Sequence, residues 1–210
     1  MKKKSLALVL ALAMIVVCVV GGTLAWLIAT TPEVKNTFTY GDINIKLEET
    51  DATVSADGSA TKEFKMIPGY TIDKDPTVTV VKDSEDCYLF VKVEKSTNFD
   101  NYMNYAIDNA WTELESGVYY IKIDTEAKKD VAYSVLGAGS ETYSNVEYTW
   151  SDNQVLVKPT VTKADMNALN ADGAQPTLTF TAYAVQLNKN NTTEFTAEEA
   201  WALAKTLPTT

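Results

Sequence analysis

The chain has 210 residues, with 18 lysines, 28 aspartates and glutamates, and no histidine or arginine, so its formal net charge is −10. This acidic balance disfavours nucleic acid as a partner. Without histidine the chain cannot form a Ser-His-Asp or Cys-His catalytic arrangement or an HExxH zinc site. We therefore expect a protein that is not an enzyme and that carries no cofactor and no metal.

The first segment has the features of an export signal. Three lysines follow Met1, residues 5–24 carry no charge, and Thr23 and Ala25 provide small side chains at the third-last and last positions of a cleavable signal. We expect signal peptidase to remove residues 1–25, which leaves Trp26 as the N-terminus of a secreted protein. The alternative is an uncleaved anchor, because about 20 apolar residues suffice to cross a bilayer.

Cleavage would leave one cysteine and a more acidic chain. It removes three lysines and no acids, so 15 lysines would remain against 28 acids, a charge of −13. Cys87 would have no partner for an intrachain disulfide. In a strand, Cys87 would lie on the same face as Leu89, Val91 and Val93, which predicts that it is a small buried hydrophobic residue. The alternative is a reactive thiol.

The first half of the mature chain alternates between apolar and polar residues, as strands do. Asp57-Gly58 and Pro68-Gly69 are turn signals between these segments. In the strongest segment, Tyr88 and Phe90 lie opposite the Cys87 face, which predicts that both faces of this strand are covered. The strands expected here are 42–48, 61–66, 76–80 and 87–94.

The second half mixes strands with short helices. Apolar residues at helical spacing predict a helix over 99–106, and residues 162–169 fit one or two helical turns. Thr196 and Glu199 form a capping box that opens a C-terminal helix. Gly137 and Gly139 are expected in a loop. The strands expected here are 117–123, 131–136, 145–150, 154–158 and 178–187.

These elements amount to eight or nine strands without βα alternation, which argues against a parallel sheet. We predict an all-β fold: a jelly-roll-like antiparallel β-sandwich with one or two short inserted helices and a C-terminal helix. No repeat or long linker interrupts it, so residues 36–210 are expected to form one domain.

Several motifs, in this order along most of the chain, resemble the TasA/camelysin family of Gram-positive bacteria. The signal junction has the sequence Gly-Gly-Thr-Leu-Ala-Trp, and Asn36-Thr-Phe-Thr-Tyr-Gly-Asp-Ile43 is similar to the family's first strand. Ile67-Pro-Gly-Tyr-Thr-Ile-Asp-Lys-Asp-Pro76 is similar to a further family segment. The segments 111–120 and 182–186, with Ala200-Trp201, resemble the clostridial branch.

The resemblance implies a secreted structural subunit of extracellular fibres in the biofilm matrix. Its partners would be other copies of itself and sibling matrix subunits, and it would meet the membrane only before cleavage. The family uses the mature N-terminal segment as a donor strand for the next subunit. Here the donor candidate is residues 26–35, with apolar Trp26, Leu27, Ile28 and Val34, and Pro32 as a limit or kink.

Other interpretations remain open. The apolar N-terminal residues can instead pack on their own domain or stay in the membrane. The chain has 11 tyrosines and 4 tryptophans, which also suits a cell-surface-anchored binding module for a polysaccharide or a host protein. Paired carboxylates would suit a glycosidase. The acidic segments 73–75 and 83–86 offer calcium ligands but lack EF-hand spacing, so solvated turns are expected.

Overall fold

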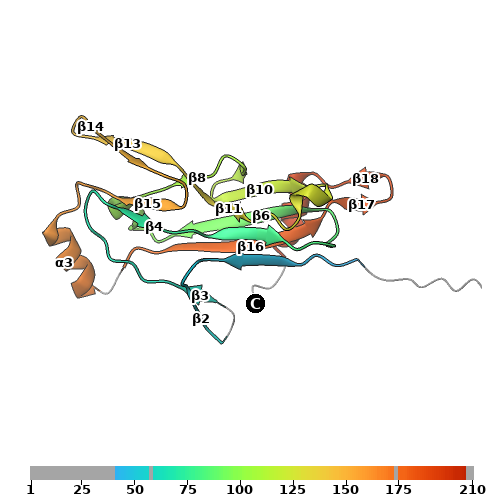
Figure 1. Cartoon of the computed structure of the whole chain (residues 1–210), viewed down its shortest axis with the longest axis horizontal. Coiled ribbons are helices and arrows are strands. Elements are labelled where there is room, and N and C mark those ends of the chain that lie inside the picture. The colour runs from blue at the N-terminus through green and yellow to red at the C-terminus, as the bar shows by residue number, and fades with distance from the viewer. Residues whose placement is uncertain (1–40, 57–58, 173–174, 207–210) are drawn as a thin grey trace, which may run out of the picture. The chain divides into compact units, whose positions relative to one another are not determined.

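The computed structural model describes residues 41–56, 59–172 and 175–206. These residues form eighteen strand segments, a 3-10 turn and three α-helices (Figure 1). Every strand pair among them is antiparallel. The predicted all-β sandwich with a few helices, one of them C-terminal, is confirmed. None of the described helices has the length and apolarity needed to span a membrane.

The central sheet has four strands in the order β16-β6-β10-β9. They are β16 (Leu178–Gln186), β6 (Cys87–Lys95), β10 (Val118–Ile123) and β9 (Thr112–Glu115). β16 pairs with β6 along all nine residues, and β10 covers the other side of β6. β6 is therefore the most buried strand of this sheet, as the apolar residues on both of its faces predict.

One face of the central sheet packs against a three-stranded sheet in the order β1-β5-β11. These strands are β1 (Ile45–Glu48), β5 (Thr77–Val80) and β11 (Tyr133–Ser134). Alternate side chains of both sheets meet between them, as in other aligned sandwiches. The fully buried members of this core are Val78, Val80, Cys87, Leu89, Val91, Ile123 and Val135.

Helix α4 (Ala197–Ala204) covers the opposite face of the central sheet. The predicted capping box opens it: the Thr196 hydroxyl accepts from the Glu199 N–H at 3.3 Å, and the Glu199 carboxylate accepts from the Thr196 N–H at 2.9 Å. Trp201 packs on Phe90 and Tyr183, each with 5.4 Å between ring centroids. The prediction that both faces of β6 are covered is thus confirmed.

The remaining elements are short and lie at the ends of the two layers. β4 (Thr71–Asp73), β15 (Gln154–Val157) and β7 (Met103–Asn104) form one small sheet. The other small pairs are β2 (Thr53–Val54) with β3 (Ala60–Thr61), β8 (Ala106–Ile107) with β12 (Leu136–Gly137), β13 (Gly139–Tyr143) with β14 (Val146–Trp150), and β17 (Asn188–Asn190) with β18 (Thr193–Glu194). The helical pieces are α2 (Phe99–Tyr102), the 3-10 turn Glu126–Lys128 and α3 (Lys163–Asp172).

The helix predicted over 99–106 is wrong beyond its first turn. α2 ends at Tyr102, and the chain then becomes extended so that β7 pairs with β15. Phe99 packs in a separate small core with Leu136 and Val155. The apolar residues after Tyr102 are buried through strand pairing rather than along one helix face, so tertiary contacts override the local spacing.

Two further expectations are corrected. The strand predicted over 61–66 is limited to Ala60–Thr61, and the loop predicted around Gly137 and Gly139 is part of β12 and β13. Both glycines allow close packing within strands. A Cβ on Gly137 would lie 2.7 Å from the Asp108 Cα, and one on Gly139 would lie 2.4 Å from the Trp150 ring.

Candidate functional site

The predicted cleavage and donor residues Thr23, Ala25, Trp26, Leu27, Ile28 and Val34 lie outside the described residues. The described domain does show a surface that suits the receiving side of strand addition. This surface is the outer edge of β16, the longest edge strand of the described sheets (Figure 1). We use the name β16 edge for the residues whose backbone N–H and C=O groups face away from β6, which are Leu178, Phe180, Ala182, Ala184 and Gln186.

Two hydrogen bonds at the ends of β16 establish which backbone groups face outward. The Leu187 N–H donates to the Asp86 carbonyl at 2.8 Å, and the Thr177 carbonyl accepts from the Ser96 N–H at 3.0 Å. Bonded and non-bonded pairs alternate in an antiparallel ladder. The odd-numbered residues of β16 therefore bond to β6, and the even-numbered residues turn their N–H and C=O groups toward the open side.

Apart from Gln186, which is exposed, the side chains of these same even-numbered residues face the sandwich core. Leu178, Phe180, Ala182 and Ala184 pack against the core between the two sheets, but each is only partly buried. On the adjacent β6, Leu89 and Val91 are fully buried. The core is thus incompletely covered on the β16 side, where an added strand would bury further apolar surface.

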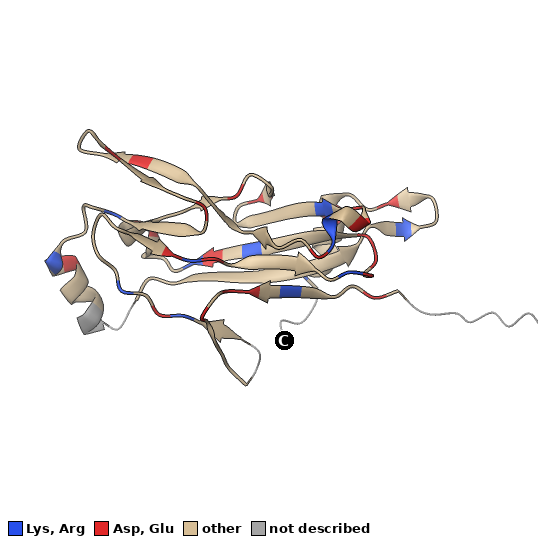
Figure 2. Cartoon of the chain, in the orientation of Figure 1, with Lys and Arg blue, Asp and Glu red and all other residues tan. Residues whose placement is uncertain are grey.

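The β16 edge lacks four of the features that protect natural edge strands, which are lysine, proline, short length and inward-pointing charge. None of its nine residues is charged or proline, and the strand is uncoloured in the charge view (Figure 2). At the other edge of the same sheet, β9 has four residues and carries Glu113 and Glu115. Within the central sheet, β16 is therefore the edge open to another strand.

Strand β1 lies beside β16 on this open side without pairing to it. The Val81 N–H donates to the Asn44 carbonyl at 2.8 Å. By the same alternation, Ile45 and Leu47 turn their backbone groups away from β5. Among the described residues the two sheets therefore have unpaired edges on one side of the sandwich, and apart from Gln186 the residues of these edges have apolar side chains.

A partly buried ion pair lies at the Phe180 end of this edge. Lys74 and Glu49 are joined at 2.8 Å, and the Lys74 ammonium lies 5.2 Å from the Phe180 ring centroid. The second carboxylate oxygen of Glu49 is buried and has no hydrogen-bond partner in the described part of the chain. An unpaired buried acceptor is costly, and the N–H of an added strand is one group that can pair with it.

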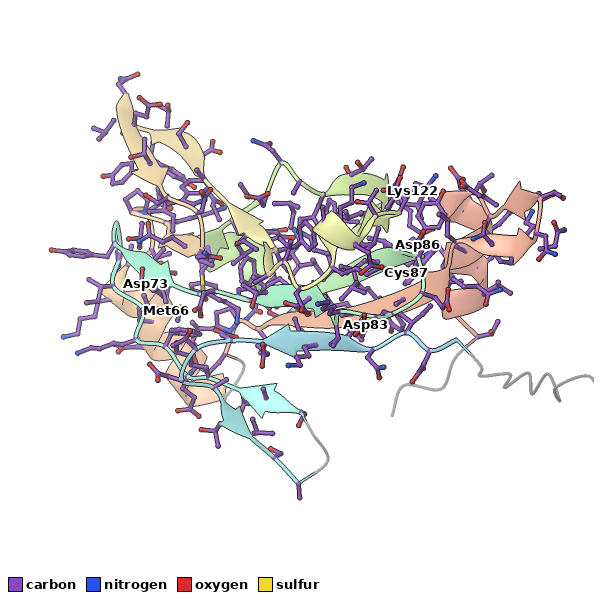
Figure 3. The ribbon with its side chains drawn as sticks, turned by 45° about the vertical axis from the view of Figure 1, so that its right-hand side comes forward. Met66, Asp73, Asp83, Asp86, Cys87 and Lys122 are labelled. Carbon is purple, nitrogen blue, oxygen red and sulfur yellow. The ribbon has the colours of Figure 1, made fainter. Side chains whose placement is uncertain are left out.

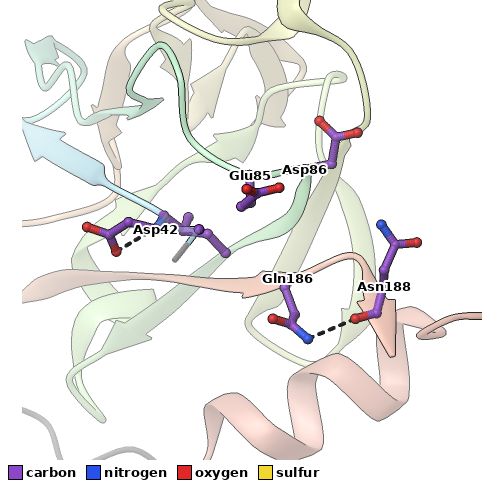
Figure 4. Close-up of a pocket in the computed structure, with 7 residues that line it drawn as sticks. Asp42, Glu85, Asp86, Gln186 and Asn188 are labelled. Atoms are coloured by element: carbon purple, nitrogen blue, oxygen red, sulfur yellow. Dashed lines mark hydrogen bonds between the residues drawn. The ribbon is translucent and has the colours of Figure 1, made fainter. Parts of the chain in front are cut away.

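A polar hollow of about 490 Å³ lies at the other end of β16 (Figure 4). Asp42, Glu85 and Asp86 line it together with Gln186 and Asn188, and the Gln186 amide donates to the Asn188 carbonyl at 2.8 Å. The described domain begins here, at Gly41. Three carboxylates make this end of the edge repel anions.

The two acidic segments do not meet, since Asp73 lies away from Asp83 and Asp86 (Figure 3). The Asp73 carboxylate accepts from the Gln154 amide at 2.9 Å. Asp86 lies 3.1 Å from the ammonium of Lys129. No group of three metal-binding side chains occurs among the described residues. Asp73 therefore takes part in a contact between β4 and β15, and Asp86 in an ion pair with a distant lysine.

Cys87 is fully buried under the sandwich core, which agrees with its predicted packing role. Burial raises the pKa of its thiol to about 12. At pH 8 only roughly one thiol in ten thousand would then be the nucleophilic thiolate. In the chain that begins at Trp26, where Cys87 is the one cysteine, we expect a soluble disulfide reagent to leave this thiol unmodified until denaturant is added. Full labelling of the folded protein within minutes would contradict this assignment.

Sequence reasoning located the strand at 178–187 but did not identify it as an open edge. Its lack of charge is the one signal in the sequence, and buried strands share that property. No protein-family model matches this chain, and neither a curated protein nor a solved structure matches it.

Proposed function

We propose that this protein is a secreted structural subunit that polymerises by strand addition, with residues 26–35 of one copy pairing along the β16 edge of the next. Export frees the apolar segment, and burial in a neighbouring subunit removes it from water. The product would be an extracellular fibre, as expected of a biofilm-matrix subunit of the TasA/camelysin type. The observation that carries the proposal is the long, uncharged edge of β16, which pairs with no other described strand on its outer side and lies beside a partly exposed core.

The donor candidate suits this edge in length and pattern. Residues 26–31 can pair without interruption along six of the nine residues of β16, over roughly 20 Å, and Pro32, which lacks an N–H, would end or kink the added strand. In a strand, Trp26, Ile28 and Val34 point to one side, while Leu27, Glu33 and Lys35 point to the other. The first set can cover the open core, and Glu33 and Lys35 can face water.

Deletion of the donor segment tests the proposal. The chain that begins at Trp26 is expected to form fibres, and the same chain without residues 26–35 is expected to stay monomeric. Electron microscopy and sedimentation measure the difference. A finding that both forms are monomeric, or that both assemble equally, would reject the donor role.

Single substitutions refine this test. Ile28→Asp places a charge on the side expected to face the core and should prevent assembly. Thr31→Asp adds the same charge on the opposite side of the segment and should leave assembly intact. Equal effects of the two changes would show that the segment does not bind as an ordered strand. Mass spectrometry of cell-surface material checks the premise, because retention of Met1 or Lys2 would place the segment in the membrane.

A further inference from the structure

A second hollow, of about 590 Å³, lies near the Leu178 end of β16, where its lining residue Lys95 is the cross-strand partner of Leu178. It shares no lining residue with the β16 edge or with the hollow near Gly41. Its walls come from the ends of β6 and α2, from the short strands β7, β8 and β9, and from β10, β13 and β14. The side chains that matter for its chemistry are Lys95, Tyr105, Glu113, Tyr119, Glu141 and Trp150.

Trp150 has an unpaired indole N–H, unlike the other two described tryptophans. The Trp111 indole donates to the Ser134 carbonyl, and the Trp201 indole donates to the Glu115 carboxylate, each at 2.7 Å. Trp150 is only 6% exposed, and its Nε1 has no hydrogen-bond partner in the described part of the chain. A buried N–H without an acceptor is rare and lowers stability. A ligand oxygen that accepts a hydrogen bond from this N–H would remove that cost.

The Trp150 ring is held in place before any ligand binds. Trp150 is the cross-strand partner of Gly139 in the β13–β14 hairpin. A Cβ on Gly139 would lie 2.4 Å from the ring, so the indole packs directly on the glycine backbone. A fixed ring loses little conformational entropy when a ligand binds. Its N–H is closed to water, so a ligand that reaches it must displace a neighbouring side chain.

The other lining groups provide both donors and acceptors. Burial raises the pKa of the Tyr105 and Tyr119 hydroxyls, so both keep their protons at neutral pH. Neither hydroxyl is hydrogen-bonded within the described residues, and the same is true of the exposed Glu113 and Glu141 carboxylates. The aromatic rings add apolar faces beside these polar groups.

This combination selects for one ligand chemistry. The lining carries one lysine and three carboxylates, those of Asp100, Glu113 and Glu141, so its formal charge is −2. This negative charge repels phosphates, sulfates and uronic acids. An ammonium group has no acceptor for the Trp150 N–H. A sugar hydroxyl both donates and accepts, and its ring presents C–H groups to aromatic faces. We propose that this hollow binds a neutral, hydroxyl-rich sugar residue of a polysaccharide, independently of fibre assembly.

The proposal is tested with the protein as it is released from producing cells. An array of neutral hexose and N-acetylhexosamine oligosaccharides, with uronic-acid oligosaccharides and lysine-rich peptides as comparisons, identifies the binding class, and calorimetry measures affinity for the best probe. We expect neutral sugars to bind. Trp150→Phe removes the N–H and keeps a ring, and we expect about tenfold weaker binding.

A matched pair on one hairpin separates binding from folding. Glu141 lines the hollow, whereas Glu147 lies on the same hairpin, is also exposed and does not line it. Glu141→Gln should weaken binding about tenfold, and Glu147→Gln should leave it within about twofold of the parent. Absence of neutral-sugar binding, binding of uronic acids or lysine-rich peptides alone, or equal effects of the two glutamine variants would overturn the proposal.

Discussion

Replacing Ala182 with proline is expected to abolish fibre formation while the subunit stays folded. Ala182 is an even-numbered residue near the middle of β16, so its N–H faces the open side and makes no bond to β6. Proline is tolerated on edge strands where the missing N–H faces outward. The fold should therefore survive, but an incoming strand would lose a hydrogen bond and meet the proline ring. Electron microscopy and circular dichroism measure assembly and folding separately.

The neighbouring residue provides the control for this change. The Thr181 N–H faces β6, where its partner residue is Lys92. Thr181→Pro should leave a carbonyl of β6 unpaired and lower the free energy of unfolding by at least about 1–3 kcal/mol. If Ala182→Pro unfolds the subunit as Thr181→Pro does, the assigned parity of β16 is wrong. If the folded Ala182→Pro subunit still forms fibres, β16 is not the receiving edge.

Replacing Trp201 with alanine is expected to cost about 3–5 kcal/mol of unfolding free energy, the usual range for loss of a buried tryptophan. Trp201 is 4% exposed and joins α4 to the central sheet through contacts with Phe90 and Tyr183. Its indole also donates to Glu115 at 2.7 Å, which ties the helix to β9. Urea unfolding measures the loss.

The same helix offers a matched control. Leu203 lies two residues further along α4 and is 46% exposed, so Leu203→Ala should change stability by less than about 0.5 kcal/mol. A Trp201→Ala protein within about 1 kcal/mol of the parent would show that α4 is not firmly packed on the sheet. In that case the outer face of the central sheet would be a second apolar surface open to partners.

The strongest elements could be predicted from the sequence because local and tertiary preferences agree in them. The alternation in β6 places Cys87 and Leu89 on one face and Tyr88 and Phe90 on the other, and both sets are buried as expected. The capping box before α4 also forms, since its hydrogen bonds are local. An element can be predicted from the sequence where its local pattern favours the same structure as its packing in the fold.

Elements that depend on distant partners could not be predicted. The apolar residues after Phe99 have helical spacing, yet Met103 is extended because it pairs with Val157, more than fifty residues away. The short strands β9 and β17 are polar and have no strong periodicity. Gly137 and Gly139 indicate a loop by composition, but their missing side chains allow close contact within strands.

The candidate site shows the same limit. The apolar donor segment is evident in the sequence because consecutive Trp26, Leu27 and Ile28 would be awkward in water. The receiving edge is not evident, because the edge position of β16 depends on which strands pair with β6 and on which side. Trp150 could be predicted as buried but not as unpaired, since hydrogen-bond satisfaction is a property of the folded environment.

Amide hydrogen exchange at β16, measured residue by residue before and after assembly, tests the central claim most directly. The Thr181 and Tyr183 amides bond to β6 and are expected to be protected in both states. The Phe180, Ala182 and Ala184 amides face the open side and should exchange quickly in the monomer, then at least about 100-fold more slowly in the fibre. Fibres in which these three amides still exchange as fast as in the monomer would contradict strand addition at β16.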